Sequence, residues 1–393
     1  MALRIVADAN IPHAADAFGA LGPVRALPGR EITHDALAQA DVLLVRSVTR
    51  VDADLLDGTP VRFVGTATAG TDHVDTAALA RMGVAFASAP GSNAASVADW
   101  VVAGLLAVAA GRGEALAGRT LGVVGVGEVG GRLAPRARAL GLEVLACDPP
   151  QQKAGVPGLV DLATVLDRAD IVTLHTPLTT PAESAWPTHG LIHDVGQLRP
   201  DAWLVNAARG PVVTAEAAGA LAATRPVLLD VWPGEPSPTP SLIGAAALAT
   251  PHVAGYAVDG KTAGTQMLAD ALRQWLGGDV PPWDASGALA PPEPLAAPPG
   301  APSDVASETA WLDALARQAY DVRADDARFR AALLGPALDH AGRAAAFAGL
   351  RATYPPRREM SRHAVSGPVP AALRPAVEAG LGVAVVITPP PPP

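Results

Sequence analysis

The chain has 393 residues, of which 49% are hydrophobic and 17% charged, and its net charge is −9. This length predicts two or three domains with sizeable cores, and the negative charge argues against nucleic acid or an anionic membrane as a partner. The single cysteine, Cys147, excludes an internal disulfide, and the N-terminus (MALRIVADAN) is unlike a signal peptide. The most apolar run, 101–110, is too short to span a bilayer, so we expect a soluble protein of the cytoplasm.

Short apolar segments alternate with helical ones in the first part of the chain. Strands are expected at 3–7, 41–46, 62–65 and 84–89, and helices at about 12–20, 33–39 and 76–81. This alternation predicts a parallel α/β sheet. A helix over 95–110 follows, and because it is apolar nearly all round we expect it to be buried between domains.

A second α/β unit begins near Thr120. Its expected helix covers 132–140, with Pro135 near the first turn, where proline costs least. Its expected strands lie at 121–124, 143–147, 170–174, 203–206, 227–230 and 247–250.

The composition changes after a long helix that is expected over 261–277. Eight prolines lie between Pro281 and Pro302, which is typical of a linker or an extended arm. A third domain is expected to follow, and because the α/β units should have complete cores without it, we expect it to serve assembly. Its expected elements are helices near 307–319 and 326–333 and a strand near 381–387, before a disordered proline tail at 389–393.

The stretch from Leu121 to Asp148 reads as strand, glycine turn, helix and strand. Gly125 allows a tight turn, Gly127 lets the backbone approach a pyrophosphate, and Gly130 lets the helix pack closely on the strand. Asp148 lies 18 residues after the last glycine, where a carboxylate can accept from the ribose hydroxyls. The stretch therefore predicts a dinucleotide site, although a glycine turn can also be purely structural.

The same acid indicates which dinucleotide binds. The carboxylate of Asp148 would repel the 2′-phosphate of NADP, and Gln151 and Gln152 bring no positive charge to the turn. The sequence therefore favours NAD over NADP.

Three later strands are followed by the polar residues Arg209, Glu235 and His252. Ligands of open α/β sheets bind beyond the carboxyl ends of the strands, so these side chains can converge on one substrate. Arg209 could bind a carboxylate through two parallel hydrogen bonds and polarise the C2 oxygen of a 2-hydroxy acid. His252 could take the hydroxyl proton, with Glu235 holding the imidazole.

Each of the three residues also has a plain structural interpretation. A histidine after a proline is often a capped loop residue, an arginine before a glycine can cap a strand end, and Glu235-Pro236 can be a surface turn. Their occurrence after successive strands, downstream of a dinucleotide turn, favours catalysis.

The motifs together resemble the D-isomer-specific 2-hydroxyacid dehydrogenase family. The resemblance is carried by VVGVGEVG, VTLHTPLT, NAARGPVV, LDVWPGEP and ATPHVAGY. Further stretches are similar to a branch of that family that has an additional third domain and acts on a phosphorylated substrate; they are 45–49, 64–75, 147–150, 252–261, 320–326 and 354–359.

The resemblance implies two Rossmann-like doubly wound parallel-sheet domains and a C-terminal α+β dimerisation domain. Its boundaries would be 1–92 with 256–280 for the substrate-binding lid, 93–255 for the NAD-binding domain and 281–388 for dimerisation. A hinge between the first two domains would close over the substrate and exclude water. We expect a homodimer, with neither nucleic acid nor a membrane as a partner.

The resemblance also assigns roles to residues, with no metal ion. The catalytic residues would be Arg209, Glu235 and His252. The NAD contacts would be Gly125, Gly127, Glu128, Val129, Gly130, Asp148, Thr176, Ala207, Ala208, Arg209, Asp230 and Gly255. The substrate contacts would be Ser47, Thr68 and Tyr256, to which the need for a cation at the phosphate adds Arg46 and Lys261.

The expected activity is NAD-dependent oxidation of a phosphorylated 2-hydroxy acid. Arg46 is the first candidate for the phosphate and Lys261 the second. The pair Arg357–Arg358 is a third, which would have to reach in from another subunit. Two alternatives remain open: a dehydrogenase for another 2-hydroxy acid, such as glycerate or 3-phosphoglycerate, and an NAD-sensing corepressor on the same fold.

Overall fold

The computed structural model describes residues 2–277, 280–335 and 337–386. It divides the chain into two compact units, 1–94 with 257–291 and 95–256 with 292–393, and each is described by itself. The expected proline tail at 389–393, and residue 387 of the last expected strand, lie outside the described residues.

The first unit contains a parallel sheet with strand order β2-β1-β3-β4-β5. Strands β1, β3 and β4 are buried along their whole length, as expected for a sheet covered on both faces. The strands expected here are present, whereas β2 was not predicted, because its exposed middle leaves no apolar run. The bounds are β1 (Ile5–Asp8), β2 (Val24–Leu27), β3 (Val42–Val45), β4 (Phe63–Thr66) and β5 (Ala85–Ser88).

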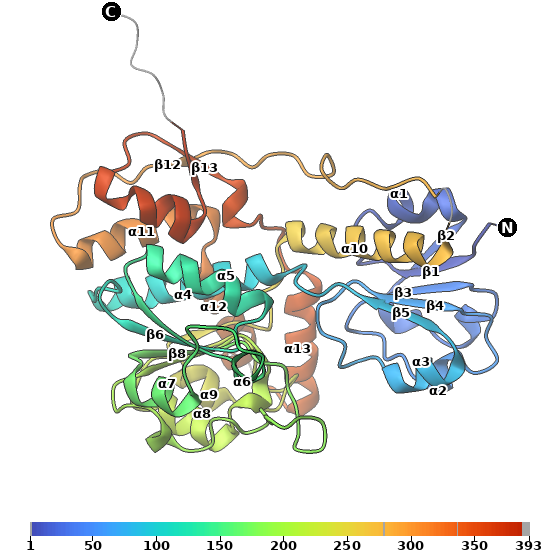
Figure 1. The fold of residues 1–393 in the computed structure, drawn as a ribbon, viewed down its shortest axis with the longest axis horizontal. Coiled ribbons are helices and arrows are strands. Elements are labelled where there is room, and N and C mark those ends of the chain that lie inside the picture. The colour runs from blue at the N-terminus through green and yellow to red at the C-terminus, as the bar shows by residue number, and fades with distance from the viewer. Residues whose placement is uncertain (1, 278–279, 336, 387–393) are drawn as a thin grey trace, which may run out of the picture. The chain divides into compact units, whose positions relative to one another are not determined.

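Helices cover both faces of this sheet (Figure 1). Helices α1 and α10 bury Phe18, Leu268 and Leu272 against one face, while α2 and α3 bury Leu56 and Leu79 against the other. The helix expected at 33–39 is only a 3₁₀ turn, and α10 begins three residues earlier than expected. The bounds are α1 (Ala14–Phe18), α2 (Ala53–Leu56), α3 (Thr76–Met82), α10 (Val258–Leu276), and the 3₁₀ turns η1 (Gly19–Leu21), η2 (Gly29–Glu31) and η3 (Asp35–Leu37).

The second unit contains a parallel sheet with strand order β11-β10-β9-β8-β6-β7. The order reverses between β6 and β8, so a crevice for a ligand is expected at the carboxyl ends of these strands. All six predicted strands of this unit are present. Their bounds are β6 (Thr120–Val124), β7 (Glu143–Cys147), β8 (Ile171–Leu174), β9 (Trp203–Asn206), β10 (Val227–Leu229) and β11 (Leu248–Ala249).

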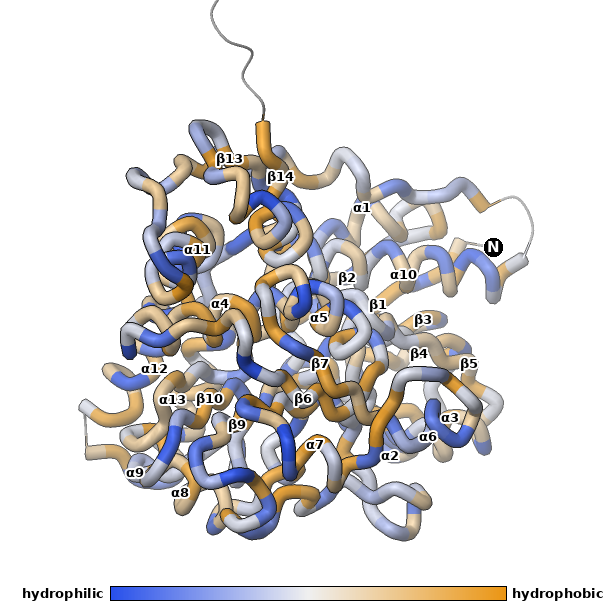
Figure 2. Tube along the Cα trace, turned by 60° about the vertical axis from the view of Figure 1, so that its left-hand side comes forward, coloured by the Kyte–Doolittle hydropathy of each residue, from blue (hydrophilic) through white to orange (hydrophobic). Residues whose placement is uncertain are grey.

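Helix α4 (Ala94–Arg112) is long and apolar enough to cross a membrane by length and composition, with a mean hydropathy of 1.7. However, 83% of that apolar window is buried inside the protein, which is the behaviour of a core helix. Figure 2 shows the hydrophobic colouring of α4 together with that of strands β6 and β7. The helix was expected to be buried between domains; it is buried within the second unit.

The remaining helices of this α/β part include one correction. Helix α5 begins at Glu128, so Pro135 lies in its interior and not near its first turn. The bounds are α5 (Glu128–Ala139), α6 (Pro149–Lys153), α7 (Leu162–Arg168), α8 (Ala215–Ala222), α9 (Pro240–Ala245), and the 3₁₀ turns η4 (Val195–Gln197) and η5 (Gly210–Val212).

The C-terminal segment combines helices with a small parallel sheet of order β12-β13-β14. The two expected helices are present as α11 and α12, and β14 lies within the expected last strand, whereas β12, α13 and β13 were not predicted. The bounds are β12 (Leu295–Ala296), α11 (Val305–Ala319), α12 (Val322–Leu334), α13 (His340–Ala352), η6 (Met360–Arg362), β13 (Ala364–Ser366), η7 (Ala371–Leu373), the π-helix η8 (Ala376–Leu381) and β14 (Ala384–Val385).

The C-terminal segment shares a hydrophobic core with the α/β part of the second unit. One cluster of buried side chains joins Trp100 and Leu106 of α4 to Trp311, Leu315 and Leu381 of the segment. The expectation that the α/β core is complete without residues 281–393 is therefore wrong, because α4 needs the segment to cover its outer face.

Candidate active site

The glycine turn after β6 has the geometry that a dinucleotide requires. Gly125 has a φ of +88°, and a Cβ there would come within 2.6 Å of the carbonyl oxygen of His175. A Cβ at Gly130 would lie 2.0 Å from the carbonyl oxygen of Gly125, so only glycine allows the helix to pack so closely. Beside Gly127, by contrast, there is open space, which leaves room for a pyrophosphate.

The start of α5 can receive an anion. Gly127 is the N-cap and provides no side-chain cap, so the first N–H groups of the helix keep their donor capacity. Glu128 is the one acid in this first turn, and Arg132 pairs with its carboxylate one turn later. The arginine therefore offsets the negative charge that Glu128 brings near the expected pyrophosphate.

Asp148 lies directly after β7, with its carboxylate at the glycine turn. Its Oδ2 accepts from the N–H of Val126 at 2.9 Å and from Gln151 Nε2 at 3.0 Å. Its Oδ1 accepts from the N–H of Gln151 at 3.1 Å and so caps α6. These bonds fix the carboxylate in one orientation, and the side chain stays partly exposed, as ribose binding requires.

Thr176 provides a separate test of whether the site fits a cofactor. Its Oγ1 is buried and has no hydrogen-bond partner among the described residues. A buried hydroxyl without a partner is costly, and an NAD molecule in this crevice would supply one. With the open space at Gly127 and the uncapped start of α5, this atom shows that the residues present fit NAD.

Arg209 follows β9 in a turn that Asn206 organises. The side chain of the fully buried Asn206 accepts from the N–H of Ala208 and donates to the carbonyl oxygen of Arg209, both at 3.0 Å. Gly210 packs against the backbone at Trp232, where a Cβ would come within 1.9 Å of a carbonyl oxygen. The turn is therefore rigid, and it leaves the Arg209 side chain half-buried at the edge of the sheet.

Glu235 and His252 form a hydrogen-bonded pair. Oε2 of Glu235 lies 2.9 Å from Nδ1 of His252, and Oε1 accepts from the N–H of Trp232 at 2.8 Å. This arrangement fixes the imidazole and leaves its Nε2 as the nitrogen for proton transfer. His252 has a φ of +59°, a left-handed conformation that is rare outside glycine and that often marks functional sites.

The charges around Glu235 favour its ionised form. Burial alone would raise the pKa of this carboxyl. The positive charge of His252, the hydrogen bonds from His252 and Trp232, and the charge of Arg351 outweigh burial, so the pKa is lowered.

Asp230 holds the loop that carries His252. Its buried carboxylate accepts from the N–H of Val253 at 2.8 Å, from the N–H of Ala254 at 2.9 Å and from Thr250 Oγ1 at 2.6 Å. Burial raises the pKa of this carboxyl. Its observed contacts are thus to the loop, while the NAD contact that the sequence predicts for it stays a prediction.

The C-terminal segment supports the same loop from another side. Arg357 Nη2 donates to the carbonyl oxygen of Ala254 at 2.6 Å, and its guanidinium lies 3.9 Å from the ring centroid of Tyr320. Tyr354 packs edge-on against Tyr256 at 5.5 Å between ring centroids. The segment reaches the loop within one chain, so the expectation that Arg357 would have to come from another subunit is wrong.

The remaining predicted substrate contacts lie in the first unit. Arg46 follows β3 and donates from Nη1 to the carbonyl oxygen of Ala67 at 3.3 Å, which places it beside the loop of Thr68. Ser47 is exposed next to it, and Thr68 Oγ1 donates to the carbonyl oxygen of Gly70 at 2.8 Å. Lys261 lies in the first turn of α10.

Several contacts that position the site could not be recognised from the sequence. Trp100 on α4 donates through Nε1 to Thr250 at 3.0 Å, and Trp232 donates through Nε1 to the carbonyl oxygen of Thr250 at 2.8 Å. Arg351, Tyr354 and Arg357 lie about a hundred residues after the loop that they contact. Trp232, Tyr354 and Arg357 lie in stretches that carry the family resemblance, but no motif indicates the contacts that they make here.

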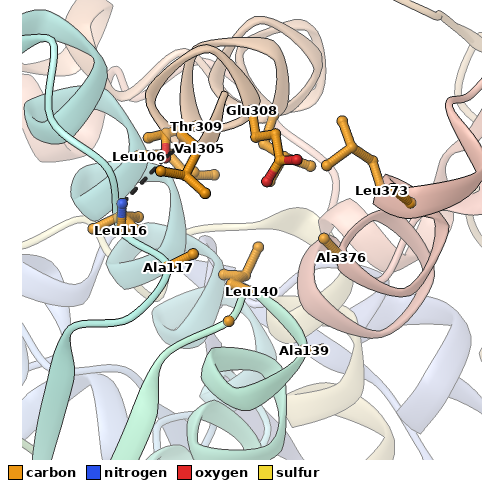
Figure 3. Close-up of a pocket in the computed structure, with 13 residues that line it drawn as sticks. Leu106, Leu116, Ala117, Ala139, Leu140, Val305, Glu308, Thr309, Leu373 and Ala376 are labelled. Carbon is orange, nitrogen blue, oxygen red and sulfur yellow. Dashed lines mark hydrogen bonds between the residues drawn. The ribbon is translucent and has the colours of Figure 1, made fainter. Parts of the chain in front are cut away.

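A cavity of about 160 Å³ opens elsewhere in the second unit (Figure 3). Apolar side chains of α4, α5 and α11 line it, among them Leu106, Leu140 and Val305, and Glu308 brings one carboxylate. None of its lining residues is a predicted site residue, so this cavity is not the expected active site.

Comparison with protein-family models gives two matches. Residues 84–254 match "D-isomer specific 2-hydroxyacid dehydrogenase, NAD binding domain". Residues 302–378 match a domain of unknown function, DUF3410.

Curated relatives match nearly the whole chain. The erythronate-4-phosphate dehydrogenase of Salinibacter ruber is 53% identical, over 96% of this chain and 98% of its own length. The erythronate-4-phosphate dehydrogenase of Azotobacter vinelandii is 48% identical, over 94% of this chain and 96% of its own length.

Solved structures match the fold over a smaller part of the chain. The TT0316 protein of Thermus thermophilus has a TM-score of 0.59 and 27% identity, and covers 69% of this chain and 98% of its own. D-Lactate dehydrogenase of Aquifex aeolicus, solved with NAD and lactic acid, has a TM-score of 0.59 and 20% identity. The match covers 69% of this chain and 95% of the lactate dehydrogenase chain.

Proposed function

Since the chain belongs to the D-isomer-specific 2-hydroxyacid dehydrogenases, and within them to the erythronate-4-phosphate dehydrogenase family, we propose that it oxidises 4-phospho-D-erythronate with NAD. The product would be (3R)-3-hydroxy-2-oxo-4-phosphooxybutanoate, an intermediate of pyridoxal 5′-phosphate (vitamin B6) biosynthesis. The observation that carries the proposal is the Glu235–His252 pair beside the Arg209 turn, in a chain 53% identical to a curated relative of that name.

The residues of the second unit suffice for the proton chemistry. Arg209 would bind the C1 carboxylate and polarise the C2 oxygen through the N–H groups of its guanidinium. His252 would accept the C2 hydroxyl proton on Nε2 while Glu235 holds Nδ1 and stabilises the imidazolium. NAD, when bound, supplies the acceptor for the hydride that leaves C2.

Cofactor and substrate contacts outside this trio follow the same proposal. The glycine turn and the start of α5 would hold the pyrophosphate, Asp148 the ribose and Thr176 a further polar group of NAD. Tyr256 and Ser47 with Thr68 would contact the substrate, and Arg46 or Lys261 would bind its phosphate. The lid would comprise 1–92 and 256–280, and the NAD-binding domain 93–255.

We further propose a cytoplasmic homodimer that associates through residues 281–388. Large hydrophobic side chains that stay exposed in this segment support the proposal, namely Val305 at 51% and Leu334 at 39%. Val305→Glu should weaken the dimer in light scattering, whereas Val156→Glu, at an exposed site outside the segment, should not. If the two variants dimerise equally well, the interface must lie elsewhere on the protein.

A substrate panel tests the proposed activity. The full chain and NAD are mixed with 4-phospho-D-erythronate, 3-phospho-D-glycerate, D-glycerate and D-erythronate, and NADH absorbance is followed. The proposal requires the highest kcat/KM for phosphoerythronate. A higher value for a glycerate compound would favour the alternative dehydrogenase, and NADH binding without any turnover would favour a corepressor.

A further inference from the structure

Arg351, near the end of α13, lies at the loop that carries the catalytic histidine. Its guanidinium carbon is 5.5 Å from the ring centroid of Tyr256. Tyr256 belongs to that loop, since its N–H donates to the carbonyl oxygen of Val253 at 2.9 Å. The charge of Arg351 also reaches Glu235 and helps to lower the pKa of that carboxyl. The C-terminal segment therefore places a positive charge close enough to influence the Glu235–His252 pair.

The guanidinium of Arg351 has no anionic partner among the described residues. Its Nε is buried there without a hydrogen-bond acceptor. The carboxylate whose pKa it influences, Glu235, uses its two oxygens for Trp232 and His252. A buried guanidinium N–H without an acceptor is unfavourable, and an anion that supplied acceptors would remove that cost.

The three arginines of the neighbouring helix α12 differ from Arg351 in this respect. Arg328 lies at the same distance, 5.5 Å, from the ring of Tyr354, but it pairs with Asp325. Arg323 pairs with Asp313, and Arg330 pairs with Asp326. These arginines form ion pairs with carboxylates of the protein. Arg351 instead lies against the ring of Tyr256, and its buried Nε has no hydrogen-bond acceptor among the described residues.

The location of Arg351 in the chain agrees with a role in specificity. It lies within residues 302–378, which match a family model of their own. The solved neighbours are matched over 94–98% of their length but cover only 69–70% of this chain. The chain thus has additional sequence relative to those folds, and Arg351 adds a cation to the catalytic unit from within it.

We propose that Arg351 binds the C4 phosphate of the substrate and thereby selects a phosphorylated hydroxy acid. This inference rests on the proposed function above. The phosphate lies two carbons beyond the C2 that His252 serves, and its oxygens suit a forked guanidinium. Tyr256, packed edge-on against Tyr354, holds the arginine through a cation–π contact.

The test compares Arg351→Gln, Arg351→Lys and the control Arg328→Gln in the full chain. Steady-state kinetics are measured with 4-phospho-D-erythronate and with D-erythronate. Arg351→Gln should raise KM for the phosphorylated acid roughly ten- to a hundredfold, the loss expected for a hydrogen bond to a charged group, and should lower kcat/KM for the phosphorylated acid much more than that for D-erythronate. Arg351→Lys should recover part of the loss, and Arg328→Gln should not change the ratio of the two kcat/KM values. Equal losses on both acids, or no loss, would overturn the inference.

A direct measurement separates this inference from the proposed function. Inorganic phosphate is titrated into the NADH-loaded full chain by calorimetry. Phosphate should bind the parent protein and Arg328→Gln alike, and Arg351→Gln at least tenfold more weakly. If the parent protein does not oxidise phosphoerythronate, the proposed function fails, while the calorimetry still decides whether Arg351 binds phosphate. Phosphate binding that is unaffected by Arg351→Gln would refute the role of Arg351.

Discussion

The indole Nε1 of Trp100 donates a hydrogen bond to Thr250 Oγ1 at 3.0 Å, which ties the buried helix α4 to the loop that carries His252. The hydroxyl of Thr250 donates in turn to Asp230 Oδ1 at 2.6 Å. The same carboxylate holds the backbone that follows His252. The orientation of the His252 imidazole thus depends on a chain of buried hydrogen bonds that begins on α4.

Thr250→Val should break this chain. The substitution leaves Trp100 Nε1 without its acceptor, and an unsatisfied buried donor costs about 1–3 kcal/mol in the free energy of unfolding. Turnover should also fall, because the loop of His252 loses an anchor. Thr265→Val is the matched control, since that buried hydroxyl donates to the carbonyl oxygen of Pro12 in the first unit. Urea unfolding and kinetics should show a stability loss in both variants and a lower kcat only in Thr250→Val; equal kcat values would argue against the anchoring role.

His252→Ala should lose most of the turnover and still bind NADH. Loss of a general acid–base group costs roughly 10²–10⁴-fold in rate, and the proposed cofactor contacts other than Gly255 lie on other loops. Stopped-flow NADH formation measures the rate, and NADH fluorescence measures binding. His189→Ala, at an exposed histidine of the same unit, should behave as the parent protein. Near-normal turnover of His252→Ala would refute the assignment.

Asp148→Ala should raise the KM for NAD and reduce the preference for NAD over NADP, because the charge that repels the 2′-phosphate is gone. The variant also loses the cap of α6, which costs about 0.5–2 kcal/mol of stability. Asp161→Ala removes the equivalent cap of α7 and controls for that cost. The ratio of kcat/KM for the two cofactors should change only in Asp148→Ala. An unchanged ratio would mean that Asp148 only caps the helix.

Glu235 should contribute to stability in a way that depends on pH. Its pKa in the folded protein is lowered from 4.5, so its stabilising effect is present above that value and is lost as the pH falls through the lower folded pKa. The difference in free energy of unfolding between the parent protein and Glu235→Gln should therefore shrink with acidification below pH 4.5. Urea titrations at several pH values measure it. A difference that stays constant would contradict an ionised Glu235.

Arg46→Ala should raise the KM for phosphoerythronate if Arg46 also binds the phosphate. A hydrogen bond to a charged group is worth about 1.5–3 kcal/mol, which corresponds to a roughly ten- to hundredfold loss. Turnover of an unphosphorylated 2-hydroxy acid should barely change. Arg62→Ala, at an exposed arginine of the same unit, is the control. If Arg46→Ala lowers kcat/KM equally for both substrates, Arg46 supports the fold, and Lys261 becomes the candidate for the phosphate site.

The sequence predicted the elements that have a strong local signal. The buried strands of both sheets form continuous apolar runs, and the glycine turn between β6 and α5 can be read directly, because Gly125 and Gly130 meet backbone atoms that exclude a Cβ. The Glu235–His252 pair was expected from the positions of the two residues after successive strands, and the structure brings them to 2.9 Å. These features depend on residues close in sequence or on the common edge of a parallel sheet.

The contacts that the sequence did not reveal are long-range. α13 was missed: Phe347 is the one buried residue of this helix, and a single large apolar side chain does not define a helical period. Pro135 misled the placement of α5, since a proline suggests a helix start. The contact of Arg357 with Ala254 spans 103 residues, and no local pattern encodes such a separation.

The same separation has a consequence for synthesis of the protein. Ala254 leaves the ribosome 103 residues before the arginine that supports its carbonyl oxygen. At an elongation rate of about 5–20 residues per second, the loop waits roughly 5–20 s for that support. During the first part of this interval the buried face of α4 also lacks Trp311 and Leu315, which cover it in the finished core. A nascent chain therefore acquires a supported His252 loop only after Arg357 has been translated. Termination before Trp311 would yield a protein with both an exposed hydrophobic face on α4 and an unsupported histidine.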